Sequence, residues 1–126
     1  MSTLKVNDII EATAGGGTFA LPRAWVNFNG VAPSSIRDSF NVASVTDLGV
    51  GRYRVNFSTS FANPSYAAVS TAGSDITDYP TQSNTQDHTS FNGATTTGNV
   101  PVFSVDQDDG EQDDADYMYV ICCGDQ

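Results

Sequence analysis

A run of carboxylates near the end of the sequence has the residue types of a cation site. The segment VDQDDGEQDDADY carries Asp106, Asp108, Asp109, Glu111, Asp113, Asp114 and Asp116 around Gly110. An EF-hand loop needs glycine at its sixth position and glutamate at its twelfth, whereas counting from Asp106 gives Glu111 and Tyr117. We therefore expect a solvated acidic loop and no metal or cofactor, with Ca²⁺ held by loops of several subunits as the alternative.

His88 is the sole imidazole, so a Ser-His-Asp triad would have to use it. The surrounding QDHTS has no nucleophile elbow and no orienting pattern. Copies of His88 could meet on a three-fold axis and bind a metal, but a loop histidine facing water is the expected state. Paired acids could cleave glycans, yet an exposed acidic run supplies neither a raised-pKa acid nor a partner at a set distance. We expect no enzyme activity.

Cys122 and Cys123 are adjacent, and on a strand their side chains leave opposite faces. A disulfide within the pair would require a strained turn. We expect two small buried thiols, with a bridge to another subunit as the alternative.

The composition limits the possible partners. The 126 residues suit one domain, and 15 acids against 5 bases give a net charge of −10. Nucleic acid and anionic membrane surfaces require clustered bases, and the five here are scattered along the chain. The first residues lack a secretory pattern and no apolar stretch has the length of a membrane span, so we expect synthesis in the cytosol.

From Arg23 onward the sequence predicts an all-β, antiparallel sandwich-like domain. In RAWVNFNG, large apolar groups fall on both faces of a strand. The segment from Ser34 to Phe61 predicts a hairpin turning at Asp47 to Gly51, with a bulge or bend near Ala43–Ser44 in its first strand. Its second strand alternates Tyr53, Val55 and Phe57 with polar side chains. SYAAVSTAG, VPVFSV and YMYVICCG are further strand candidates, and no long helix is expected.

Two segments fall outside this pattern. Residues 1–22 form a separable N-terminal segment ending after a Gly15–Gly17 run, and residues 23–126 form the head domain. Residues 73–99 are polar and irregular, which is more often functional than idle in a compact domain.

The predicted strands also demand partners. Sheet edges are usually protected by lysine or proline, but the single lysine, Lys5, lies far from the strands. The Trp25 strand is apolar on both faces. Together these features favour a symmetric homo-oligomer.

Several blocks of the sequence resemble a module of bacteriophage tail fibre proteins, especially those of phages of marine and cyanobacterial hosts. The blocks are RAWVNFNG, SIRDSFNVASVTDLGVGRYRVNFSTSF, SYAAVSTAG and DYMYVICCGDQ, and the opening MSTLKVNDI is similar to the start of those fibres. The resemblance implies a homotrimeric, β-rich virion protein of the tail that touches the host surface, with residues 1–22 attaching it to other tail proteins. It supplies no catalytic residue.

On this reading the protein adsorbs to the host by binding a surface glycan or protein through many copies at once. Six polar side chains of the long irregular stretch are the candidate receptor contacts: Asp78, Tyr79, Gln82, Asn84, His88 and Asn92. Trp25 could stack on a sugar, but we expect it to pack, with Phe28, Phe40, Tyr53, Val55 and Phe57, in the core or at a subunit interface. The alternative function is a structural virion protein, a tail adaptor or capsid-surface knob, that binds other phage proteins.

Overall fold

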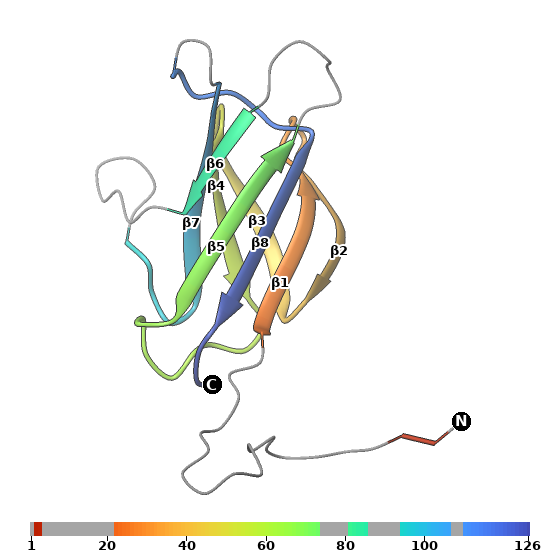
Figure 1. The fold of residues 1–126 in the computed structure, drawn as a ribbon, viewed down its shortest axis with the longest axis vertical. Coiled ribbons are helices and arrows are strands. Elements are labelled where there is room, and N and C mark those ends of the chain that lie inside the picture. Colours follow the sequence, from red (N-terminus) through yellow and green to blue (C-terminus); the bar gives the residue numbers. More distant parts are fainter. Residues whose placement is uncertain (1, 4–21, 74–80, 86–93, 107–109) are drawn as a thin grey trace, which may run out of the picture.

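The chain folds into two antiparallel four-stranded sheets packed face to face. A computed structural model describes residues 2–3, 22–73, 81–85, 94–106 and 110–126. The strands are β1 (Pro22–Asn29), β2 (Ser35–Phe40), β3 (Val42–Gly49), β4 (Arg52–Phe57), β5 (Ala67–Gly73), β6 (Thr81–Thr85), β7 (Asn99–Asp106) and β8 (Tyr117–Cys123). One sheet has the order β2-β1-β8-β5 and the other β3-β4-β7-β6 (Figure 1). The predicted all-β sandwich is confirmed.

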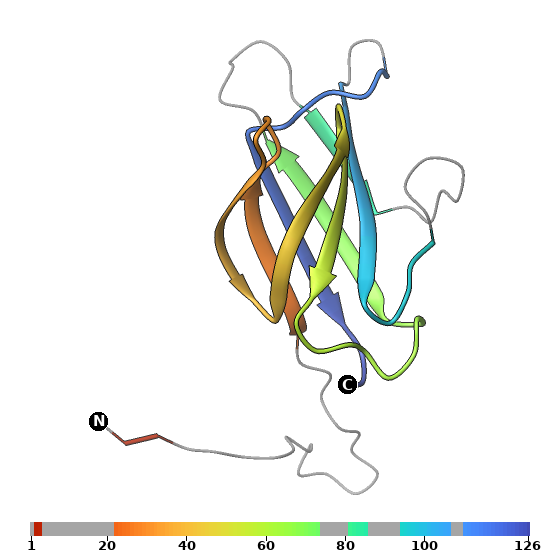
Figure 2. The ribbon, with the colours of Figure 1, turned by 180° about the vertical axis from the view of Figure 1, so that it is seen from behind.

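Alternation along β1 and β8 forms one wall of the core. Ala24, Val26 and Phe28 of β1 are buried between the sheets, as are Met118 and Val120 of β8. The intervening residues therefore point to the outer side, since successive side chains of a strand leave opposite faces. The other wall comes from the second sheet, seen from behind in Figure 2.

The predicted hairpin is confirmed by β3 and β4. Tyr53, Val55 and Phe57 are buried, whereas the alternate residues of β4 are partly exposed. The turn includes Gly51 at φ +63°, and a Cβ there would lie 2.6 Å from the carbonyl oxygen of Ser104. Only glycine fits this turn without displacement of the backbone.

The segment before this hairpin differs from the prediction. The expected single strand is broken at Asn41, so that β2 belongs to one sheet and β3 to the other. Asn41 has φ 56°, a left-handed conformation that asparagine tolerates, and its side chain bonds the backbone of Arg23 and Thr59. The predicted bulge is present in β3, between Val42 and Ser44.

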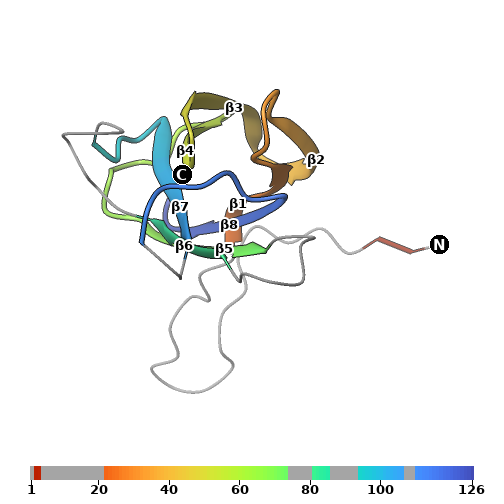
Figure 3. The same ribbon diagram turned by 90° about the horizontal axis from the view of Figure 1, so that it is seen from above.

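The two sheets approach one another at both sides of the sandwich (Figure 3). On one side β2 runs directly into β3, and on the other β5 lies beside β6. Strand β6 falls inside residues 73–99, which were expected to be irregular throughout, so that expectation is wrong for residues 81–85. The part of the chain that the structure describes contains no helix.

Aromatic side chains fill the interior. Phe28 meets Tyr53 edge to face with ring centroids 5.2 Å apart, and Phe57, Phe61 and Tyr66 form a second group. Edge-to-face and offset contacts are the favoured geometries of such rings. Four of the six residues expected in the core or an interface are thus in the core: Phe28, Tyr53, Val55 and Phe57. Trp25 and Phe40 are not, because they lie on the outer face of their sheet.

The first strand begins at the last residue of the predicted N-terminal segment. Pro22 already belongs to β1, whereas residues 1 and 4–21 lie outside the described part of the chain.

Candidate functional site

The outer face of the β2-β1-β8-β5 sheet carries a row of large apolar side chains. Trp25 on β1 is the register partner of Phe40 on β2 and of Ile121 on β8. Ile121 in turn is opposite Val69 on β5. Register partners on one face are near neighbours, so these four residues, here called the apolar row, cross all four strands.

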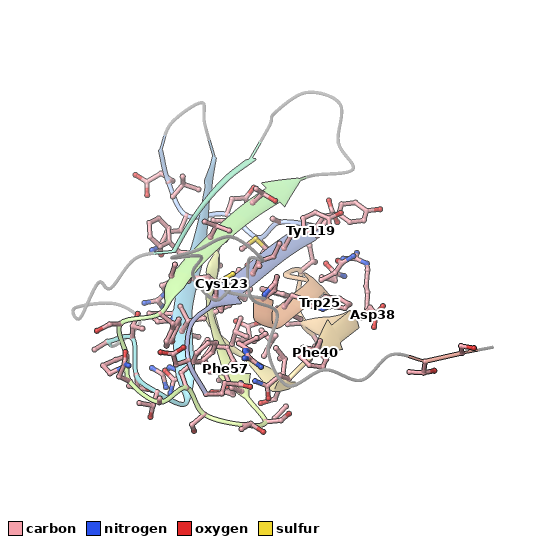
Figure 4. All side chains as sticks on the ribbon, turned by 60° about the horizontal axis from the view of Figure 1, so that its bottom comes forward. Trp25, Asp38, Phe40, Phe57, Tyr119 and Cys123 are labelled. Atoms are coloured by element: carbon pink, nitrogen blue, oxygen red, sulfur yellow. The ribbon has the colours of Figure 1, made fainter. Side chains whose placement is uncertain are left out.

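The apolar row is open to solvent in the single chain. Phe40 is 55% exposed, Ile121 44% and Val69 62%, while Trp25 is partly buried between its neighbours. Figure 4 shows Trp25 between Phe40 on β2 and the outward residues Tyr119 and Cys123 of β8. Contiguous apolar surface of this kind is typical of an interaction site, whereas single exposed apolar residues are ordinary.

Aromatic and charged groups extend the apolar row toward one end of the sheet. Tyr117 and Tyr119 of β8 stack with ring centroids 6.5 Å apart. The guanidinium of Arg37 lies 4.4 Å from the centroid of the Tyr117 ring, a cation–π contact. Asp38 follows Arg37 and is the register partner of Asn27. This end of the face is amphipathic.

The outer face of the β3-β4-β7-β6 sheet is polar by comparison. Arg52, Arg54 and Asn56 lie on β4, one of its two central strands, and the residues opposite the two arginines on β7 are Phe103 and Pro101. The side-chain amide of Asn56 donates to the hydroxyls of Ser44 at 3.0 Å and Thr46 at 2.9 Å. These bonds fix a polar ladder across β3 and β4. The two outer faces of the sandwich therefore differ in chemistry.

Two of the six candidate receptor contacts lie on this second sheet. Gln82 and Asn84 are on β6, in register with Val105 and Phe103 of β7. Asp78, Tyr79, His88 and Asn92 lie outside the described residues. The proposed metal site on copies of His88 falls outside them as well.

The acidic segment is less solvated than expected at Asp114. Its Oδ1 accepts a hydrogen bond from the Gly51 amide at 2.7 Å and another from the Tyr53 hydroxyl at 2.8 Å. Burial and the adjacent carboxylate raise the pKa of Tyr53 above its ordinary value. Asp114 thus ties the acidic segment to the β3–β4 turn. Among the described residues, no group of three or more His, Cys, Asp or Glu is placed to hold a metal.

The two cysteines are free and differ in surroundings. Cys122 is buried among the core residues, and burial raises the pKa of its thiol to about 12. Cys123 is only partly buried, so the expectation of two buried thiols holds for one of them. An intersubunit bridge through Cys123 stays a prediction.

A small recess opens between the sheets beside β1, and its lining offers no catalytic group. It is lined by Ala24, Trp25, Val26, Val42, Val55, Phe57, Val120 and Cys122. Cys122 is the sole ionisable side chain in it, and its raised pKa keeps the thiol protonated at neutral pH. The recess therefore belongs to the packing of the sandwich.

The sequence analysis did not identify Val69, Ile121 or Tyr119 as surface residues of interest. A signal was present, because YMYVICC has large or apolar side chains at every position. Such a strand presents apolar groups on both faces whichever way it is turned.

Comparison with protein-family models, with curated proteins and with solved structures found no match to this chain. The described residues include no helix with the length and apolar character to cross a membrane.

Proposed function

We propose that this chain is a bacteriophage tail fibre protein that attaches the virion to the host cell surface, as a homotrimer that binds a surface glycan. The sequence blocks listed above support the assignment, because they resemble the modules of such fibres over most of the chain. An antiparallel sandwich is compatible with that family.

The observation that carries the glycan proposal is the polar outer face of the β3-β4-β7-β6 sheet. Sugars bind through hydrogen bonds to their hydroxyls and through contact of their C–H faces with aromatic rings. Gln82 and Asn84 are in register with Val105 and the aromatic Phe103, while Asn56 and Arg54 occupy the neighbouring strand β4. This combination of amides and an aromatic residue suits a glycan better than an apolar ligand.

Attachment through such a surface depends on the number of copies that bind at the same time. A shallow polar face binds one glycan weakly, because its groups are solvated before binding. Three copies in one fibre, and several fibres on one particle, present many such faces at high effective concentration. Firm adsorption then needs only modest affinity at each face.

A structural role in the virion is the second candidate, and the apolar row favours it. Its exposed side chains would fit a neighbouring phage protein, as in a tail adaptor or capsid-surface knob. In that case the partner is another component of the particle and not the host.

Adsorption is tested with soluble protein labelled by an amine-reactive dye, for which Lys5 is the only lysine. We expect saturable labelling of susceptible marine cyanobacterial cells and its loss after periodate oxidation of their surface glycans. Gln82→Ala and Asn84→Ala should weaken the labelling, whereas Ser58→Ala, at an exposed residue that follows β4, should not. Absence of labelling with a correctly assembled protein would support the structural role.

A further inference from the structure

We propose that the outer face of the β2-β1-β8-β5 sheet, centred on the apolar row, is the surface through which copies of this chain pack together. This surface would be the contact between subunits of the homo-oligomer, so the proposal rests on the proposed function, which includes a homotrimer. The occupant of the face is a second copy of the same chain.

The face supplies a large part of the area that a stable contact needs. Four strands about 4.8 Å apart, each seven or so residues long, span roughly 19 Å by 24 Å. This is a projected area of about 450 Å², which side-chain relief enlarges toward the ~800 Å² per partner of a standard interface. The apolar row runs across the whole width, from Phe40 on the edge strand β2 to Val69 on the opposite edge.

The charge of the face points to a second copy. Each chain carries a net charge of −10, so copies repel one another over most of their surface. On the strand positions that face outward on this sheet, the charged residues are Arg23, Arg37 and Asp38, two bases against one acid. Two copies therefore meet with least repulsion here.

The neighbours of Trp25 favour a protein partner over a sugar. Within the apolar row Trp25 is flanked by Phe40 and Ile121, neither of which can bond a sugar hydroxyl. An aromatic residue flanked by apolar side chains, with Arg37 and tyrosines at the rim, has the composition of a protein interface centre.

The edge strand β2 adds a second feature that a copy would cover. All but one of its residues are exposed, including Ile36, the register partner of Phe28. Within the described parts of the chain, no further strand pairs with its outer backbone groups. Packing of another copy against this face and edge would cover both.

The test compares two matched substitutions by sedimentation equilibrium and light scattering. Val69→Lys places a charge in the apolar row, and Val50→Lys makes the same change in the β3–β4 turn, where Val50 is 58% exposed. Lysine lowers the net negative charge and so weakens general repulsion, which means that any dissociation must come from the contact itself, through lost apolar packing and burial of an unpaired charge. We expect Val69→Lys to raise the dissociation constant at least tenfold and Val50→Lys to leave it unchanged.

Trp25 gives an independent readout because it is the only tryptophan. In the wild-type oligomer its emission should be blue-shifted and protected from acrylamide, and dilution or Val69→Lys should remove that protection. If circular dichroism shows that Val69→Lys is unfolded, Phe40→Lys takes its place, since Phe40 is exposed on the same row.

The outcomes separate this contact from the adsorption function. If the oligomer keeps its mass in Val69→Lys, or leaves Trp25 as accessible as in the monomer, the contact is elsewhere and the inference is overturned while the homo-oligomer stands. A wild-type mass of one chain, or a Trp25 signal that responds to host polysaccharide but not to protein concentration, also overturns it. Labelling of host cells can fail without affecting any of these measurements, and then only the adsorption function falls.

Discussion

Replacement of Asp114 by alanine should destabilise the sandwich by about 3 kcal/mol. Its Oδ1 accepts from the Gly51 amide at 2.7 Å and from the hydroxyl of Tyr53, a residue with no exposed surface. Hydrogen bonds to a charged acceptor contribute about 1.5–3 kcal/mol each, and Asp114 is only partly buried, so the lower end of the sum applies. Since small domains unfold with about 5–15 kcal/mol, this is a large fraction of the total.

Urea unfolding followed by circular dichroism measures this change as a lower midpoint with an unchanged slope. Asp125→Ala is the matched control, because the same carboxylate is removed from an exposed site, and it should shift stability by less than about 0.5 kcal/mol. A double-mutant cycle with Tyr53→Phe should give a coupling energy of about 1–2 kcal/mol. Equal effects of Asp114→Ala and Asp125→Ala would refute the role assigned to this carboxylate.

Two further predictions concern Asn41, where the chain crosses from β2 to β3, and the buried thiol and tyrosine hydroxyls of the core. Asn41→Gly should lower the free energy of unfolding by about 2 kcal/mol, because the hydrogen bonds to the Thr59 backbone are lost. Asn41→Ala should lower it by about 1 kcal/mol more, because alanine disfavours the left-handed conformation. An equal loss in both variants, measured by urea unfolding, would contradict this. Because folding raises the pKa values of Cys122, Tyr53 and Tyr66, these groups lose their protons at lower pH in the unfolded chain than in the folded one. The free energy of unfolding should therefore be at its full value below the ordinary pKa of the Cys122 thiol, 9.0, and should fall as the pH rises toward about 12. Cys122→Ala should delay that fall to the ordinary tyrosine pKa of 10.0, whereas Cys123→Ala should not, in unfolding curves across this pH range.

The parts of the fold that could be predicted were those governed by local alternation. Strand β4 reads as a half-buried strand in the sequence and is one in the structure, because its apolar face has a single period. The break at Asn41 could not be predicted in this way. Phe40 and Val42 continue the alternation across it, and only the tertiary bonds of Asn41 to the Arg23 and Thr59 backbones reveal the crossing between sheets.

Strand β6 was missed for a related reason. The sequence TQSNT has no apolar alternation to indicate a strand. It pairs with β7 through backbone hydrogen bonds, and backbone pairing leaves no mark in the side-chain pattern. Gln82 and Asn84 were chosen as contacts for their place in the long polar stretch and for their side-chain chemistry, and their position on a sheet edge was not predicted.

The outward position of Trp25 follows from the register of β1, but the core formed by the described residues does not account for the size of its side chain. Ala24, Val26 and Phe28 fill the core, so the strand period forces Trp25 to the outer face. A shift of one residue would bury Trp25 and bring polar Asn27 into the core, so folding fixes the direction of position 25 but places no demand on the size of its side chain. The largest side chain of the protein therefore lies on the outer face, only partly buried by the described part of the chain, where we propose that a second copy packs against it.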